Sequence, residues 1–342
     1  MKQNNNVKLP PFEVTHVVSS LSQVTGWGIH QLNVPKTWSI TKGAGICVMV
    51  IDTGYCDHSD LDGAMDGKAS RSFLNYETEK LDLNGHSSHC CGIIGARDNS
   101  SGMVGVAPEC TIITCKVLGK DGTGDNNAVN DALRYAIQTK PDVISMSLGS
   151  SYYYAEQHNL IKELYKLNIP IIAAAGNDGR SGAVNYPGKY PETICVTAFD
   201  DKGRPARFNS TGDTVDFSAP GVDIYSTFLN NQYAKLSGTS MATPFIAGLV
   251  ALLIAKHKKQ ELETGENDCV TVPQIKEHLV KYADDKGIVG KDSTWGYGVI
   301  DPLKLISHLH DTQKVIIEEP IDIIKEKKSL WIKLRRWFKK VF

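Results

Sequence analysis

Short runs of almost continuous apolar residues alternate along this chain with segments of helix length. The runs end at turn residues and cover 46–51, 112–118, 143–148, 169–175 and 194–199. Strands of this kind are typical of a parallel sheet that is covered on both faces. Helices are expected between and after them, at 87–96, 126–139, 156–167, 240–258 and 273–283. The alternation predicts a doubly wound α/β fold, in which a mostly parallel central sheet carries helices on both faces.

Three regions of the chain differ in composition. Residues 1–21 are polar and contain prolines, residues 22–310 carry the strand and helix pattern, and residues 311–342 begin acidic and end basic. We therefore expect one large domain with a short N-terminal extension and a C-terminal tail. The chain is 41% hydrophobic and 22% charged, which is ordinary for a soluble globular protein. Its net charge of −1 argues against nucleic acid as a partner.

The N-terminal residues, the longest apolar run and the cysteines indicate the cellular compartment of the protein. The first residues contain no apolar stretch of the length that a secretory signal needs, and the longest apolar run, 245–255, is too short to span a bilayer. We expect a cytoplasmic protein, in which the eight cysteines remain free thiols. No CxxC pair occurs, and the spacing of the cysteines predicts no zinc site.

Three segments carry residue types that serve in nucleophilic catalysis. Asp52 ends an apolar run in VIDTG, His86 opens a predicted helix in NGHSSH, and Ser240 precedes a long apolar helix in GTSMATP. Each has another interpretation by itself: a turn residue for Asp52, a metal ligand beside His89 for His86, and a helix N-cap for Ser240. A serine nucleophile needs an adjacent base, and the base needs an orienting group. The three residues supply these roles in the chain order Asp, His, Ser.

Five further motifs accompany this order and the GTSMATP already named: GVAPE, SMSLG, AAAGNDG, NYPGKYPE and SAPGV. With them the chain resembles the subtilisin-like serine proteases, the subtilases, over most of 23–302. The resemblance implies their three-layer fold and a serine endopeptidase with Asp52, His86 and Ser240 as catalytic triad. It also implies that the side chain of Asn177 and the backbone N–H of Ser240 bind the oxyanion of the tetrahedral intermediate.

The resemblance further implies how substrate and metal are held. An extended peptide would add to two edge strands and rest over a pocket for the residue before the cleaved bond. The edge strands are Gly122, Thr123, Gly124 and Ser147, Leu148, Gly149; the pocket residues are Ala174, Gly176 and Asn185. A structural Ca²⁺ would take side-chain oxygens of Gln23, Asp60 and Asn99 and carbonyl oxygens of Arg97, Ser101 and Met103. A polar surface loop is the alternative interpretation of these six positions.

Several positions depart from the family pattern. Ser87 and Ser88 follow the catalytic histidine where most relatives have Gly-Thr, and Phe245 stands where His is usual. These changes affect local packing rather than triad atoms. Asn185 stands where many relatives have Gly, which makes the pocket shallower or more polar. Cys90 resembles the thiol beside the catalytic histidine of proteinase K-like relatives.

The two ends suggest regulation. Residues 8–12, KLPPF, resemble the short extension of intracellular subtilisins, whose proline-bearing segment lies across the active site; a disordered tail is the alternative. In the C-terminal tail, apolar residues recur from Leu330 at steps of three and four beside Lys and Arg. Such a helix contacts a membrane surface at the inner leaflet or docks on protein, and the sequence leaves both open. Homodimerisation is a further expectation from intracellular relatives.

Three functions follow from these observations. The first is an intracellular, broadly specific endopeptidase that acts on peptide or protein substrates and is inhibited by its own leader. The second is a dedicated protease that processes a precursor or leader peptide. The third is a catalytically silent binding protein on the same fold, which an intact triad with Asn177 disfavours.

Overall fold

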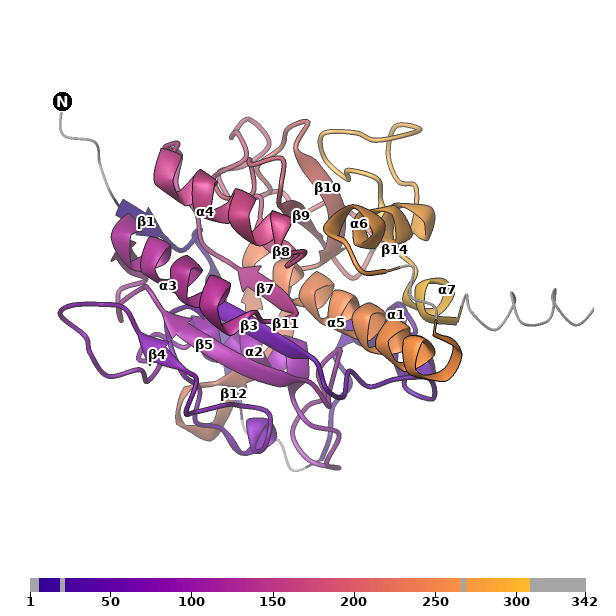
Figure 1. The fold of residues 1–342 in the computed structure, drawn as a ribbon, viewed down its shortest axis with the longest axis horizontal. Coiled ribbons are helices and arrows are strands. Elements are labelled where there is room, and N and C mark those ends of the chain that lie inside the picture. Colours follow the sequence, from indigo (N-terminus) through magenta and orange to yellow (C-terminus); the bar gives the residue numbers. More distant parts are fainter. Residues whose placement is uncertain (1–5, 19–21, 266–268, 308–342) are drawn as a thin grey trace, which may run out of the picture. The chain divides into compact units, whose positions relative to one another are not determined.

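A computed structural model describes residues 6–18, 22–265 and 269–307, and for 13–18 it describes the backbone alone. Its centre is a seven-stranded sheet in the order β10-β9-β8-β7-β3-β5-β4, whose paired neighbours are all parallel (Figure 1). The strands are β3 (Cys47–Asp52), β4 (Arg71–Ser72), β5 (Thr111–Lys116), β7 (Val143–Met146), β8 (Ile171–Ala174), β9 (Ile194–Phe199) and β10 (Val215–Pro220).

Alternate residues of the central strand β3 belong to two separate hydrophobic cores. In β3, Val48 and Val50 belong to one apolar cluster, while Met49 and Ile51 belong to another. The first cluster is completed by α2 (His86–Gly95) and α5 (Thr239–Thr264), the second by α3 (Asn126–Thr139) and α4 (Ala155–Lys166). Since successive side chains of a strand point to opposite faces, both faces are apolar and both carry helices. The predicted α/β fold of three layers is confirmed.

The parallel strands bring their carboxyl ends to one edge of the sheet. β3 ends at Asp52, which pairs with Lys116 of β5, and β7 and β8 end at Met146 and Ala174. Residues that follow these strands therefore meet above the same edge. α2 begins at His86 and α5 begins at Thr239. Both helices contact β3 and each other, so their first residues complete this edge.

The predicted elements lie within a few residues of the observed ones, with one exception in length. The helix expected at 240–258 is α5, which continues to Thr264 and ends at Gly265, a residue in the left-handed conformation. Every residue from Thr239 to His257 is buried. This helix is long and apolar enough to cross a membrane, but the apolar window lies wholly inside the fold. It is therefore the core helix of the domain.

Smaller sheets and three further helices surround this central layer. A three-stranded antiparallel sheet joins β11 (Ile224–Phe228), β12 (Gln232–Ser237) and β2 (Glu13–Val18), and pairs form between β1 (Asn6–Lys8) and β6 (Thr123–Asp125) and between β13 (Ala283–Asp284) and β14 (Val299–Ile300). The helices α1 (Trp27–Gln31), α6 (Val272–Lys281) and α7 (Pro302–Ser307) complete the fold, α6 being the helix expected at 273–283. The N-terminal extension thus contributes two strands. The predicted C-terminal tail lies outside the described residues.

Candidate active site

Asp52 and His86 form a buried hydrogen-bonded pair at the edge of the sheet. His86 Nδ1 lies 2.8 Å and 3.0 Å from the two carboxylate oxygens of Asp52, and neither residue is exposed. A proton on Nδ1 donated to this carboxylate leaves the lone pair on Nε2. Among the described residues, Nε2 has no hydrogen-bond partner. The imidazole is therefore oriented as a base whose acceptor nitrogen is available.

The residues after β3 hold the start of α2 in place. The hydroxyl of Thr53 accepts a hydrogen bond from the backbone N–H of Ser87 at 2.9 Å and donates to Asp82 at 2.9 Å. The same carboxylate accepts the backbone N–H and the hydroxyl of Ser88, at 2.9 Å and 2.7 Å. Ser88, one of the departures from the family pattern, is thus anchored. Sequence analysis missed Thr53 and Asp82, although both lie within a few residues of the catalytic pair.

Ser240 is the second residue of α5, whose N-cap is Gly238, so the N-cap interpretation of Ser240 is wrong. Its hydroxyl donates to the carbonyl of Ser147 at 3.3 Å, and the hydroxyl of Ser147 donates back to the carbonyl of Ser240 at 2.9 Å. No hydrogen bond joins Ser240 to His86 in the part of the chain that is described. Ser240 thus lies at the positive end of a helix, but its hydroxyl is directed toward Ser147 and not toward His86.

Asn177 is oriented by α5. Its side-chain oxygen accepts the backbone N–H of Thr239 at 3.0 Å and the hydroxyl of Thr239 at 2.8 Å. The amide nitrogen therefore points into the cleft, where it donates to the carbonyl oxygen of Pro11 at 2.6 Å. This is the donor position expected of an oxyanion-binding group. Thr239, which sequence analysis did not single out, is its positioning residue.

The N-terminal extension occupies the cleft between the two predicted edge strands. β1 pairs with β6, with Val7 opposite Gly124 and Lys8 opposite Thr123. On the other side Lys8 exchanges two backbone hydrogen bonds with Gly149, at 3.1 Å and 2.9 Å. The backbone N–H of Leu9 then donates to Gly122 at 3.0 Å. The extension thus binds as the middle strand of a three-stranded arrangement.

Side chains of the extension seal the same cleft. Val7 and Leu9 are buried, while Lys8 between them is exposed. The ring of Phe12 lies 5.0 Å from the ring of His86, centroid to centroid. Leu148, which lies between Ser147 and Gly149 in the second edge strand, is buried in the second apolar core.

Two prolines interrupt the pairing at the nucleophile. If the ladder that pairs Lys8 with Gly149 continued, residue 10 would donate its N–H to the carbonyl of Ser147. Pro10 has no N–H, and that carbonyl accepts the hydroxyl of Ser240 instead. The carbonyl held by Asn177 belongs to the next residue, Pro11. The extension therefore passes the nucleophile one residue out of register.

The predicted pocket residues surround the loop after β8. Asn185 lies against two glycines: a Cβ at Gly176 would be 2.5 Å from its amide nitrogen, and one at Gly149 would be 3.0 Å from its Cβ. The amide donates to the carboxylate of Asp178 at 2.7 Å. Ala174 ends β8 below them. The pocket wall is polar, and Asp178 gives it a negative charge.

Four of the six predicted calcium ligands lie in the loop after α2, and hydrogen bonds join Gln23 and Asp60 to that loop. The backbone N–H of Met103 donates to Asp60 at 2.6 Å, and the amide of Asn99 donates to it at 3.2 Å. The side-chain oxygen of Gln23 accepts the N–H of Ser100 at 2.7 Å. Among the described residues, no hydrogen bond ends on the carbonyl oxygens of the remaining positions, Arg97, Ser101 and Met103. These three carbonyls, beside a carboxylate and two amides, suit a hard cation such as Ca²⁺.

Cys90 lies one turn along α2 from the catalytic histidine. Its sulfur is 3.9 Å from His86 Nδ1 and donates to the carbonyl of Ser240 at 3.5 Å. Burial raises the pKa of this thiol well above its ordinary value, with the nearby Asp52 adding to the effect. The protonated thiol is a packing group rather than a nucleophile. The described residues include all eight cysteines of the chain, and no disulfide joins any two of them.

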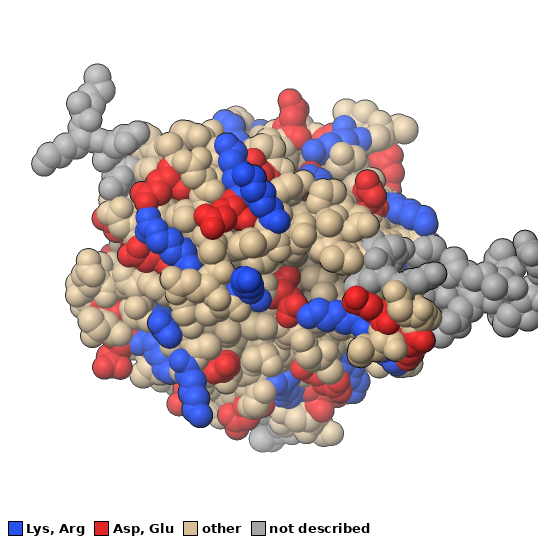
Figure 2. Space-filling view, viewed as in Figure 1, with Lys and Arg blue, Asp and Glu red and all other residues tan. Residues whose placement is uncertain are grey.

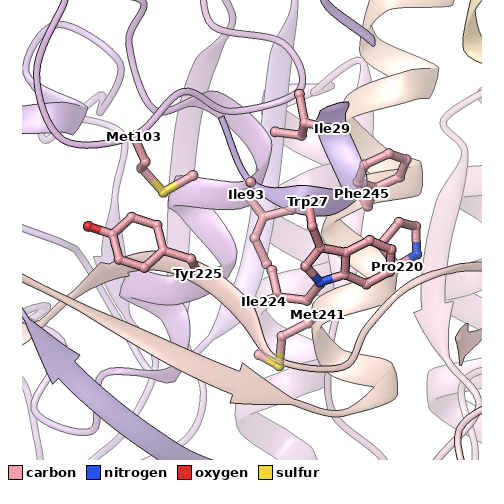
Figure 3. A pocket seen from close by; sticks show the side chains of 11 residues that line it. Trp27, Ile29, Ile93, Met103, Pro220, Ile224, Tyr225, Met241 and Phe245 are labelled. Atoms are coloured by element: carbon pink, nitrogen blue, oxygen red, sulfur yellow. The ribbon is translucent and has the colours of Figure 1, made fainter. Parts of the chain in front are cut away.

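Phe245 packs behind the nucleophile. It lines a small apolar cavity of about 20 Å³ together with Trp27, Ile93 of α2 and Met241 of α5 (Figure 3). Figure 3 shows the ring of Phe245 above the indole of Trp27, with Pro220 beside the indole. A cavity of this size holds at most about one water molecule. The departure at Phe245 is therefore filled by close packing and opens no hole beneath α5.

Known proteins resemble this chain over most of its length. The sequence profile of the Subtilase family matches residues 43–298. An intracellular serine protease of Paenibacillus polymyxa is 35% identical over 318 residues, which cover 90% of this chain and 95% of that protein. Subtilisin DY of Bacillus licheniformis is 40% identical over 241 residues, 69% of this chain and 86% of that protein. The minor extracellular protease Epr of Bacillus subtilis (strain 168) is 37% identical over 275 residues, which cover 80% of this chain and 40% of that longer protein.

Proposed function

Because the chain belongs to the subtilase family and is a serine-type endopeptidase, we propose that it acts inside the cell on many peptide and protein substrates. The intracellular location is supported by the relative from Paenibacillus polymyxa, which is named an intracellular serine protease and is matched over 95% of its length. We also propose that residues 6–12 inhibit the enzyme until they leave the cleft. The observation that carries this proposal is the hydrogen bond from Asn177 to the carbonyl of Pro11.

In the proposed mechanism, His86 Nε2 takes the proton of Ser240 as the hydroxyl attacks a peptide carbonyl. Asp52 holds the other ring nitrogen and stabilises the imidazolium. Asn177 and the backbone N–H of Ser240 bind the oxyanion. His86 then protonates the leaving amine, and water hydrolyses the acyl-enzyme.

The bound extension prevents this sequence in two ways. It fills the cleft through main-chain hydrogen bonds with Gly122 and Gly149, so a substrate strand cannot add there. It also leaves the carbonyl of Ser147 without a backbone N–H, and Ser240 donates to that carbonyl rather than to His86. Once the extension leaves, a substrate N–H can take the carbonyl of Ser147. The hydroxyl of Ser240 is then released to rotate toward the base.

Broad specificity is supported by the way the cleft binds the extension. The extension binds through backbone atoms, which every peptide offers. The side chain of Lys8, between the buried Val7 and Leu9, is exposed and adds no selectivity. The wall made by Asn185 and Asp178 favours small, polar or basic residues before the cleaved bond. A dedicated precursor-processing protease is the alternative. A narrow cleavage profile on a peptide library would support that alternative, and cleavage at many sequences would exclude it.

We further propose a structural Ca²⁺ at the loop of Asp60 and Asn99. The ion would tie residues around Gln23 to this loop through the six oxygens described above. Two other proposals concern parts of the chain outside the described residues or a second copy: contact of the basic tail with an inner-leaflet surface, and homodimerisation. Cosedimentation of full-length protein with anionic vesicles tests the first, and sedimentation equilibrium tests the second.

Mass spectrometry of the purified protein, alone and mixed with a peptide library, tests the main proposal. We expect an intact N-terminus in fresh Ser240→Ala protein, N-terminal clipping in the wild type, and cleavage of many library peptides by the clipped form. Rapid cleavage of the library by wild-type protein whose N-terminus stays intact would reject the inhibitory role of the extension while leaving the protease activity in place.

A further inference from the structure

A second cluster of metal-binding residue types lies at the far end of the helix that carries the nucleophile. It consists of His257 in α5, His278 in α6 and Cys269 in the segment between the two helices. One ligand atom from each lies within 4.8 Å of the other two, and the two imidazole rings are 5.0 Å apart, centroid to centroid. His257 and Cys269 are buried, whereas His278 is half-buried.

The local sequence turns the chain so that these residues meet. α5 ends at Gly265, whose positive φ of 78° and hydrogen bond to Glu261 close the helix. α6 begins with a capping box between Thr271 and Gln274 and has a proline in its first turn. α6 comes close to the later turns of α5 (Figure 1), where His257 and His278 lie near each other. His278 lies beside Leu279, which faces the core, so it borders the buried face of α6.

The donor set is that of zinc rather than of calcium. One thiolate and two imidazoles are borderline-soft ligands, and Zn²⁺ binds them at about 2.3 Å and 2.0–2.1 Å in tetrahedral geometry. Such bond lengths place the ligand atoms about 3.4–3.6 Å from one another. The observed limit of 4.8 Å lies within about an ångström of that arrangement, a difference that small side-chain rotations can close.

We propose that His257, Cys269 and His278 bind one Zn²⁺, with water in the fourth position. The site is structural and separate from the active site. Seventeen residues of α5 separate His257 from Ser240, a distance of about 25 Å along a helix. A bound ion would fasten α6 to α5. It would also brace α7, because the side chain of the neighbouring Lys256 donates to the carbonyl of Leu305 at 3.2 Å.

The sequence spacing concealed this site. The sequence analysis predicted no zinc site because no CxxC pair occurs and the cysteine spacing suggests none; the proposal made from this cluster differs from that prediction. Its three residues stand twelve and nine positions apart, and no common zinc motif has that spacing. A second group, Asp52, His86 and Cys90, also has ligand atoms within 4.8 Å of one another but belongs to the active site. Any test must therefore distinguish the two groups.

Zinc titration of full-length, metal-free Ser240→Ala protein tests the proposal without interference from autolysis. We expect one equivalent of Zn²⁺ by native mass spectrometry and a thiolate-to-metal charge-transfer band when Co²⁺ replaces it. Cys269→Ser and His278→Ala should each weaken Zn²⁺ at least as much as loss of an outer-shell partner does, which is about 10–100-fold. Cys47→Ser and His30→Ala are matched controls away from the cluster and should retain the affinity. Cys90→Ala should retain it as well.

Three results would overturn the assignment. One is the lack of stoichiometric binding by a protein that circular dichroism shows to be folded. Another is unchanged affinity in both Cys269→Ser and His278→Ala. The third is loss of binding in Cys90→Ala alone, which would place the ion at the active site. Because the side chain of His278 is only half-buried, its variant keeps the test valid if Cys269→Ser does not fold.

Discussion

Leu9→Ala should partly release the inhibited enzyme. The side chain of Leu9 is 8% exposed and packs against Gly122, where a Cβ would lie 3.0 Å from its nearest methyl group. The substitution removes three carbons, each worth about 0.8 kcal/mol when buried, or about 2.4 kcal/mol in total. It leaves the backbone hydrogen bonds of the extension intact. With about 1.4 kcal/mol for each factor of ten, the fraction of molecules with an open cleft should rise about 50-fold.

The assay is the initial rate of hydrolysis of a fluorogenic peptide by freshly made protein, with intact mass measured on the same sample to show that the extension is uncleaved. A variant lacking residues 1–12 sets the ceiling of the rate. This truncation is preferable to removal of 1–21, because β2 pairs with β12 and its loss would expose a strand edge. Lys8→Ala is the matched control, since the Lys8 side chain is exposed. Its rate should stay within about twofold of wild type.

Two outcomes would contradict the reasoning. If the truncated enzyme is no faster than the full-length enzyme, the extension does not inhibit. If the truncated enzyme is faster but Leu9→Ala and Lys8→Ala behave alike, the extension inhibits without the packing of Leu9, and the estimate from buried carbon is wrong.

Three other predictions concern ions, protons and the prolines. Removal of Ca²⁺ should lower the unfolding free energy by about 2.7 kcal/mol relative to protein at one hundred times the Kd; re-added Ca²⁺ but not Zn²⁺ should restore it, and an effect equally large in Asn99→Ala would place the ion elsewhere. Burial lowers the pKa of His89 to about 3, so only the unfolded state gains this proton as the pH falls from 6.5, and stability should drop by about 2 kcal/mol between pH 7 and pH 5. Urea unfolding at the two pH values measures this drop in stability, which should be smaller in His89→Asn. An equal drop in His89→Asn and in the wild type would contradict the role of His89. Pro10→Ala combined with Pro11→Ala should restore the backbone register and convert the extension into a better substrate, seen as faster loss of the first ten or eleven residues than the wild type shows; an extension that survives as long as in the wild type would show that the prolines do not protect it.

The central layer could be predicted from the sequence because its signals are local. β9 was expected at its observed bounds, and β3 within one residue, since each is an apolar run bounded by turn residues. The proposed triad residues stand out in the sequence because their motifs are long and each residue lies at a strand end or in the first turn of a helix. Where the local pattern and the tertiary role of a segment agree in this way, the sequence is sufficient to predict the element.

The rest depends on contacts between distant residues. β1 is a strand because it pairs with β6, more than one hundred residues later, and its own three residues carry no periodic pattern. The register shift at Pro10 is visible only once Lys8 is paired with Gly149. The cluster of His257, Cys269 and His278 requires the turn between α5 and α6. The spacing of these three residues in the sequence did not predict the cluster.

Labelling with a fluorophosphonate probe tests the central claim most directly, because the probe reacts only with a serine that its base has activated. Protein lacking residues 1–12 should gain one probe on Ser240, located by peptide mapping, and should do so at least ten times faster than freshly made full-length protein whose extension is intact. Labelling of the truncated protein at another serine, or none at all, would contradict the assignment of Asp52, His86 and Ser240. Equal labelling rates for the two proteins would contradict the closed cleft.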